Sequence, residues 1–207
     1  MTLYRYLITL LLGLLLISCN TDKKDKSTST QAHNKIKLVS NDKYISDLPE
    51  NAVFIGQNID DFIGYVPSLY DVNKEKIQLE GADYDVFNVY EQDEKLFAVE
   101  PKFDNPDVVW RIWIYSPELK TEKEIGVDAT LADIKSNYTI EHIGTEENLN
   151  IKVKNSSIAF IMDSSKLPEN WWKNMDTEEI PDSLPVNKMI IQKPGSYLLI
   201  EKDKKSK

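Results

Sequence analysis

The sequence predicts an α+β fold in which short helices pack on antiparallel meander sheets. Two observations lead to this prediction. Two short segments carry apolar residues at the spacing of one helix face, and each is followed by three runs that read as strands. Turn-like polar residues separate neighbouring runs, as expected for hairpin connections between antiparallel strands.

Each predicted helix begins at a residue that caps helices well. Asn58 and Thr130 have side-chain oxygens that accept hydrogen bonds from the first backbone N–H groups, and Asp61 and Asp133 follow three residues later, as in a capping box. Pro67 ends the first helix because proline cannot donate a backbone hydrogen bond. The apolar positions of the two helices are Ile59, Phe62, Ile63 and Val66, and Leu131, Ile134 and Tyr138.

The strand-like runs follow the two helices in the same order. They are 84–90, 96–100 and 108–115 after the first helix, and 149–153, 158–162 and 189–192 after the second. The two helix caps lie 130 − 58 = 72 residues apart. We therefore predict a duplicated helix-plus-three-strand unit, at about 53–116 and 125–192, within a globular region over 36–201. The alternative is a chance similarity between two amphipathic helices.

The charge balance excludes one class of partner. The chain has 207 residues, with 25 Lys and Arg against 34 Asp and Glu, so its formal net charge is −9. A net negative chain without a long basic run is not expected to bind nucleic acid, because phosphates require clustered cations. The single cysteine is Cys19, so the folded region has no thiol for disulfide or metal chemistry.

Cys19 follows an apolar N-terminal segment. Residues 7–17 are almost entirely apolar, a length that suits a signal peptide and is too short to span a bilayer. The Leu-Ile-Ser-Cys order that ends at Cys19 resembles the lipobox of bacterial lipoproteins with a type II signal peptide. The resemblance implies that residues 1–18 are removed and that Cys19 carries fatty acids such as palmitate, which hold the protein to a membrane. An ordinary secretory signal with a leftover thiol is the alternative.

The residues after Cys19 bear on the location of the protein. Residues 20–35 are polar and should form a flexible tether, and the polar tail 202–207 should be frayed. Position 20 is Asn rather than the Asp that retains enterobacterial lipoproteins at the inner membrane, so the resemblance implies the outer membrane. Asp22 and Asp25 alternate with lysines, unlike the acidic cluster of surface-exposed lipoproteins of the Bacteroidetes, which favours the periplasmic face.

The predicted architecture, over about residues 53–192, resembles two groups of proteins. A short helix followed by an antiparallel meander is similar to small outer-membrane lipoproteins of the SmpA/OmlA type, and tandem copies are similar to β-lactamase-inhibitor-protein-like domains. Members of both groups bind proteins rather than catalyse reactions. The resemblance therefore implies a non-enzymatic, lipid-anchored binding module with a partner in the cell envelope.

One predicted strand, 109–115, carries candidate ligand-binding residues. Strand alternation places Trp110, Ile112 and Ile114 on one face and Arg111, Trp113 and Tyr115 on the other. The first set is expected in the core. The second set is a candidate aromatic platform for a peptide or a sugar, with Arg111 as a charged clamp. The alternative is a sheet that is covered on both faces, with Arg111 lying along Trp113.

The longest connection, 166–186, supplies the remaining candidates, Trp171 and Trp172. Long connections without their own secondary structure often carry function. Adjacent tryptophans point in different directions, so one is expected to plug the domain while the other is exposed. The alternative is a hydrophobic clasp made by both. Exposed tryptophans suit a carbohydrate-binding accessory lipoprotein, which is the second functional hypothesis.

The sequence contains no recognisable catalytic constellation. His142 is the one histidine of the folded region, so a zinc site would need carboxylates for its remaining ligands. The chain lacks a Gly-x-Ser-x-Gly nucleophile elbow and a phosphate-binding glycine loop. We therefore predict no catalytic residues, no metal and no cofactor. An envelope hydrolase built on acidic residues and His142 is the third hypothesis.

Overall fold

The computed structural model describes residues 35–39, 48, 51–79, 82–145 and 148–201. Cys19, the expected signal segment, nearly all of the expected tether and the polar tail therefore lie outside the described residues. No helix within these described ranges has the length and apolar character needed to cross a membrane.

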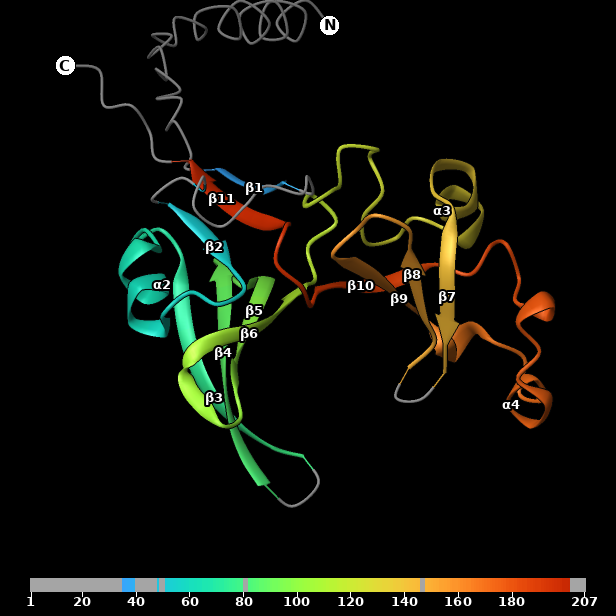
Figure 1. Cartoon of the computed structure of the whole chain (residues 1–207), viewed down its shortest axis with the longest axis horizontal. Helices are drawn as coiled ribbons and strands as arrows, with labels where there is room; N and C mark the ends of the chain where they lie inside the picture. Colours follow the sequence, from blue (N-terminus) through green and yellow to red (C-terminus); the bar gives the residue numbers. More distant parts are fainter. Residues whose placement is uncertain (1–34, 40–47, 49–50, 80–81, 146–147, 202–207) are drawn as a thin grey trace, which may run out of the picture. The chain divides into compact units, whose positions relative to one another are not determined.

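Two antiparallel sheets dominate the described chain (Figure 1). The smaller sheet has the order β1-β11-β2, formed by Lys35–Val39, Tyr197–Glu201 and Ala52–Phe54. The larger sheet has eight strands in the order β3-β4-β5-β6-β10-β9-β8-β7. These strands are β3 (Asp71–Leu79), β4 (Ala82–Glu91), β5 (Glu94–Lys102), β6 (Asn105–Ile114), β7 (Ile140–Gly144), β8 (Asn150–Val153), β9 (Ile158–Met162) and β10 (Val186–Ile191). The result is an α+β fold rich in antiparallel strands, as predicted.

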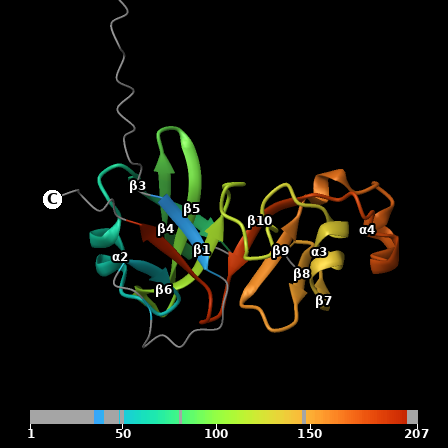
Figure 2. The same cartoon turned by 90° about the horizontal axis from the view of Figure 1, so that it is seen from above.

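The helices of the described residues are short. They are α2 (Ile59–Tyr65), α3 (Leu131–Asn137) and α4 (Trp171–Asn174), with 3-10 turns η2 (Ser164–Lys166) and η3 (Thr177–Glu179). Figures 1 and 2 show α2 at the end of the large sheet formed by β3–β6, whereas α3 and α4 lie at the end formed by β7–β9.

Helix α2 begins where the sequence predicts. The side-chain oxygen of Asn58 accepts hydrogen bonds from the backbone N–H groups of Asp60, at 2.9 Å, and Asp61, at 3.4 Å. The helix ends at Tyr65, two residues before Pro67, which agrees with the predicted stop. The buried Ile59 and Phe62 join this helix to the core.

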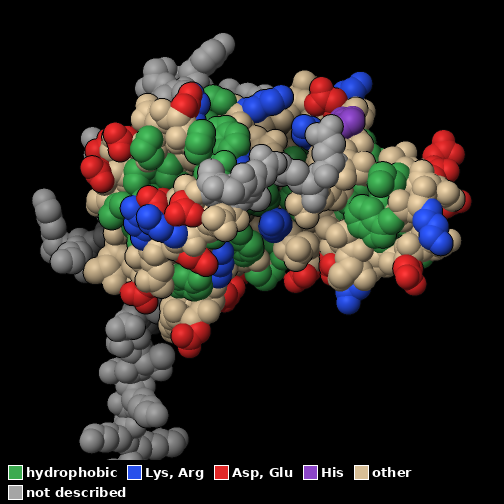
Figure 3. All heavy atoms as spheres, turned by 90° about the horizontal axis from the view of Figure 1, so that it is seen from below, with side chains coloured by type: hydrophobic (Ala, Val, Ile, Leu, Met, Phe, Trp, Pro, Cys, Tyr) green, Lys and Arg blue, Asp and Glu red, His purple; other side chains and the backbone are tan. Residues whose placement is uncertain are grey.

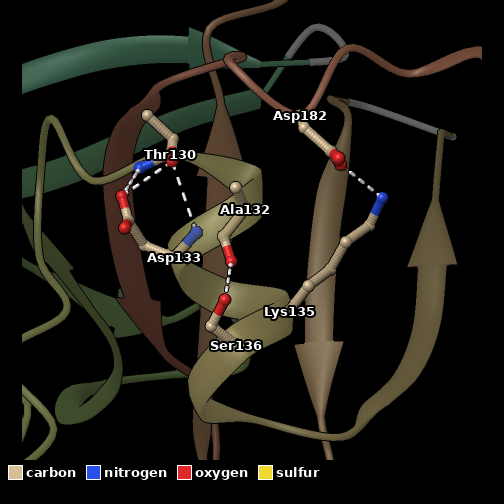
Figure 4. Close-up of polar contacts among 6 residues, drawn as sticks. All are labelled: Thr130, Ala132, Asp133, Lys135, Ser136 and Asp182. Atoms are coloured by element: carbon tan, nitrogen blue, oxygen red, sulfur yellow. Dashed lines mark hydrogen bonds and ion pairs between the residues drawn. The ribbon is translucent and has the colours of Figure 1, made fainter.

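Helix α3 has a complete capping box (Figure 4). Thr130 Oγ1 accepts from the backbone N–H of Asp133 at 3.3 Å, and the backbone N–H of Thr130 donates to Asp133 Oδ2 at 2.8 Å. The Thr130 hydroxyl also donates to that oxygen, at 2.7 Å. These hydrogen bonds favour the ionised carboxylate and lower the pKa of Asp133.

Two further contacts complete the surroundings of α3. The Ser136 hydroxyl donates to the backbone oxygen of Ala132 at 2.8 Å, within the helix. Lys135 Nζ lies 2.6 Å from Asp182 Oδ1, which belongs to the connection before β10 (Figure 4). The ion pair is exposed, so it orients the two side chains and contributes little to stability.

One large apolar cluster forms the core, on one face of the eight-stranded sheet. It takes Phe62 from α2, Ile134 from α3 and Trp171 from α4, together with Val53 and Leu198 of the smaller sheet. The large sheet contributes Phe87, Val89, Phe97, Val99, Ile112, Ile114, Ile151, Val153, Ile158, Phe160, Met189 and Ile191. The described helices and the smaller sheet therefore cover the same face of the large sheet.

The structure differs from the sequence prediction in the number of strands. Four strands, rather than the three of the predicted repeat unit, follow each of α2 and α3, and the additional ones are β3 and β7. Of these two, β7 corresponds to the strand-like run 139–143 around His142. Both are edge strands of the large sheet, and β3 in particular is rich in charged residues. The connection 166–186 is also not structureless, because it contains α4 and η3.

Candidate binding surface

The face of the large sheet opposite the core carries a continuous row of side chains. Strand pairing sets Asn73, Asn88, Ala98, Trp113, Ile190, Ala159, Lys152 and His142 opposite one another, with one residue on each strand. Directly opposed residues of neighbouring strands lie on the same face, so the row crosses the whole sheet. We call this side of the sheet the open face.

No described helix packs on the open face. Its apolar side chains form a second cluster, separate from the core, made by Val86, Ala98, Trp113, Ala159, Ile161 and Ile190, with Ile77 and Tyr115 packed against it. Every one of these residues belongs to the large sheet or directly follows β6. Long side chains of the same face, rather than another layer of the described chain, therefore shield this apolar floor.

Trp110 lines the open face, contrary to the alternation read from the sequence. Arg111 pairs with Glu100, whereas Val109 pairs with Pro101, so Trp110 is an extra residue between two register positions. Such a bulge moves the residues on one side of it to the other face of the strand. Val109 takes the core position, and the side chain of Trp110 is 39% exposed. The prediction that Trp110 lies in the core is therefore wrong.

Cations lie over the two tryptophan rings of β6. The guanidinium carbon of Arg111 is 3.7 Å from the ring centroid of Trp110 and 5.8 Å from that of Trp113. Lys188 Nζ, from β10, is 4.2 Å from the Trp113 centroid. Arg111 Nε also lies 2.7 Å from Glu100 Oε2, as a close ion pair without hydrogen-bond geometry. These contacts hold the Arg111 guanidinium in one place.

The third aromatic ring of this group belongs to Tyr115. Lys95 Nζ lies 4.2 Å from its centroid. Burial raises the pKa of Tyr115 to about 12, with a further contribution from the carboxylate of Glu100. The structure thus brings together the predicted residues Arg111, Trp113 and Tyr115. The sequence could not show Lys95, which comes from the neighbouring strand.

The cations of the open face lie close enough to affect one another. Burial lowers the pKa of Lys188, the carboxylate of Glu100 raises it, and the nearby Lys95 and Arg111 lower it again. Burial is also the main reason why the pKa of Lys95 is lowered. The carboxylates of Glu100, acting on Lys188, and of Glu75, acting on Lys95, therefore offset only part of these effects on the two lysine pKa values.

A pocket of about 290 Å³ opens on this face. Its lining is Trp110, Arg111, Trp113, Asn148, Asn150, Lys152, Ala159, Ile161 and Gln192. The described residues of this lining include two cations, Arg111 and Lys152, and no Asp or Glu. Trp113 is only 9% exposed, and its Nε1 is buried without a hydrogen-bond partner among the described residues. Buried polar groups are usually paired, so this donor is one of the few exceptions among the described residues.

The tryptophans of the long connection lie apart from this pocket. Trp171 is 2% exposed, and its Nε1 donates to the backbone oxygen of Asp176 at 2.8 Å. Trp172 is 39% exposed. Of the two alternatives for this pair, the structure has the one with Trp171 buried and Trp172 exposed, so the ring of Trp171 is not accessible to a ligand. At the right of Figure 3, the end where α4 lies, hydrophobic side chains form a patch of their own.

A larger hollow, of about 620 Å³, lies near the end of α3. Its lining is polar, and two of its cations already have partners within the chain. Lys123 donates to the backbone oxygen of Asn137, and Lys135 is paired with Asp182. We therefore regard the pocket of the open face, with its buried unpaired donor, as the better candidate.

The third sequence hypothesis requires His142 to lie among carboxylates. His142 is exposed on the edge strand β7, opposite Lys152. Within the described ranges, no three His, Cys, Asp or Glu side chains gather closely enough to hold a metal ion. The described residues therefore offer no metal-binding cluster around His142.

Comparison with known proteins leaves the family open. No protein-family model matches the chain, and no curated protein matches it. Among solved structures, the chain is similar to the uncharacterized protein yfeY from Escherichia coli, with a TM-score of 0.46 and 12% sequence identity. The matched region covers 65% of this chain and 87% of the yfeY chain. A likeness at this level carries no functional argument.

Proposed function

We propose that this protein is a non-enzymatic lipoprotein that binds another envelope protein on the open face of its eight-stranded sheet. The open face itself carries the proposal, because an apolar, aromatic floor lies there with no described layer over it. Above this buried floor, Trp110 is 39% exposed beside Arg111, and aromatic residues and Arg are enriched in protein interfaces. The lipobox-like order at Cys19 supports an acyl anchor, and Asn20 supports the periplasmic side of the outer membrane as the location.

A protein partner suits this face better than a glycan. A sugar ring packs on a bare aromatic face, whereas the rings of Trp110, Trp113 and Tyr115 each have a cation over them. Cations fixed in this way complement the carboxylates and carbonyl groups of a protein surface. The carbohydrate-binding alternative would use Trp172, which is exposed outside the open face.

We also propose that the sheet arose by duplication of a unit with one helix and four strands, α2-β3-β4-β5-β6 and α3-β7-β8-β9-β10. Each N-cap residue forms an antiparallel bridge at the fourth strand of its unit. Asn58 pairs with Val108 in β6, and Thr130 pairs with Pro185, which directly precedes β10. At the junction of the two units, Trp113 on β6 is paired with Ile190 on β10. The two bridge partners, Val108 and Pro185, are 185 − 108 = 77 residues apart in the sequence. The paired residues Trp113 and Ile190 are also 190 − 113 = 77 residues apart. This common offset supports two equivalent units that meet edge to edge.

Recovery of partners from chemically crosslinked membranes tests the anchor and the surface in one experiment. We expect the wild-type chain in the membrane fraction, crosslinked to an envelope protein. Cys19→Ser should leave the membrane fraction, because it has no acyl anchor. Trp110→Ala should remain in the membrane fraction and lose most of the partner, since a large aromatic residue at an interface contributes about 2 kcal/mol or more.

Trp172→Ala is the matched control, because Trp172 and Trp110 are both 39% exposed. It should keep the partner. Loss of the partner in Trp172→Ala, with retention in Trp110→Ala, would move the binding site to α4. Membrane association of Cys19→Ser would contradict the lipid anchor, and a wild-type chain without any crosslinked envelope protein would contradict the binding function.

A further inference from the structure

The pocket of the open face has a more specific chemistry than the surface around it. Its polar lining consists of the cations Arg111 and Lys152 and the amides Asn148, Asn150 and Gln192. No acidic side chain is among the described residues that line it, and Glu100 is paired with Arg111 at 2.7 Å. With Glu100 counted, these described groups still carry one net positive charge, which favours an anionic ligand group.

Trp113 supplies this pocket with a buried donor. Its side chain lines the pocket, and its Nε1 makes no hydrogen bond with any residue that the structure describes. An indole N–H can only donate, so the partner that it lacks must be an acceptor. A ligand in this pocket, which Arg111 and Lys152 also line, can supply that acceptor.

The guanidinium of Arg111 is fixed before any ligand arrives. It is stacked at 3.7 Å on Trp110, and its Nε faces Glu100 at 2.7 Å. A guanidinium has five N–H donors, so the contact with Glu100 does not exhaust its hydrogen-bonding capacity. A cation fixed in advance loses little conformational entropy when it binds a carboxylate.

We infer that this pocket receives the carboxylate of an Asp or Glu side chain of the partner protein, with Arg111 and Lys152 supplying positive charge and Trp113 Nε1 donating to a carboxylate oxygen. A carboxylate offers acceptors only, which matches this set of donors. The inference rests on the proposed function, since it names the partner group that the open face receives.

Nitrogen-edited NMR of the full chain tests this inference through the indole signals. The chain has four tryptophans, and the signal that disappears in Trp113→Phe identifies Trp113. The probes are the blocked peptide acetyl-Gly-Glu-Gly-amide and its matched control acetyl-Gly-Gln-Gly-amide, with inorganic phosphate as a third probe. We expect the Glu peptide to shift the Trp113 indole signal in a saturable way and the Gln peptide to leave it unchanged.

Two exposed lysines provide matched variants. Lys152→Gln should lower the affinity for the Glu peptide about tenfold, because it removes one charge-assisted contact. Lys173→Gln, on α4, should bind the peptide like the wild type. Equal shifts with the Glu and Gln peptides would overturn the inference, as would a clear preference for phosphate or unchanged binding in Lys152→Gln.

The two proposals can fail separately. If partner recovery depends on Trp110 but the Glu peptide does not shift Trp113, the open face still binds the partner and the carboxylate pocket is rejected. If the Glu peptide shifts Trp113 but partner recovery does not depend on Trp110, the pocket chemistry stands and its use for that partner is rejected.

Discussion

Phe62→Ala should lower the free energy of unfolding by about 3–5 kcal/mol. Phe62 is fully buried on α2, and its ring meets those of Phe87 and Phe97 edge-on, at centroid distances of 6.5 and 6.3 Å. The substitution removes the ring that joins the helix to β4 and β5 and leaves a cavity between them. A helix of seven residues is not stable alone, so α2 depends on this packing.

Urea unfolding followed by circular dichroism measures this loss. Ile63→Ala is the control, because Ile63 follows Phe62 in the same helix and its side chain is exposed. The control should change the free energy of unfolding by about 1 kcal/mol or less. Similar small losses in both variants would contradict the packing of α2 on the sheet.

Trp171→Ala should also lower the free energy of unfolding by about 3–5 kcal/mol. The neighbouring substitution Trp172→Ala should lower it by about 1 kcal/mol or less. Trp171 is buried in the core cluster, and its indole N–H donates to the backbone oxygen of Asp176. The ring therefore fixes both α4 and the residues that follow it. Trp172 contacts the Trp171 ring at a centroid distance of 5.1 Å and is exposed on its other sides.

The same urea experiment compares the two tryptophan variants. Because the residues are adjacent, they share the backbone and differ mainly in burial. Equal large losses would support the alternative of a clasp made by both rings. A small decrease in the free energy of unfolding in both variants would mean that the connection 166–186 is not held to the core through Trp171.

The local signals predicted α2, α3 and the inner strands, but not α4. Asn58 and Thr130 cap α2 and α3, and Pro67 follows the end of α2, because these interactions involve residues only a few positions apart. The run 158–162 matches β9, whose five residues are all buried. The edge strand β3 was missed because its charged residues weaken the alternation that reveals a half-buried strand.

The sequence predicted only some of the residues of the open face. Alternation grouped Arg111, Trp113 and Tyr115 correctly, but it assigned Trp110 to the core, because a bulge depends on the pairing of two strands rather than on one. Lys95 and Lys188 come to the aromatic rings from other strands. The pocket likewise joins β6 to β8 across β10 and β9, a neighbourhood that no local pattern predicts.

The central claim is that the partner contacts the open face, and site-specific photocrosslinking in cells tests it most directly. Gln192 is a suitable position for a photoreactive residue, because it is exposed and lines the pocket. Lys173 on α4 is an exposed control position. We predict a crosslinked envelope protein from position 192 and none from position 173. Crosslinks from position 173 alone would contradict the account and place the partner on α4.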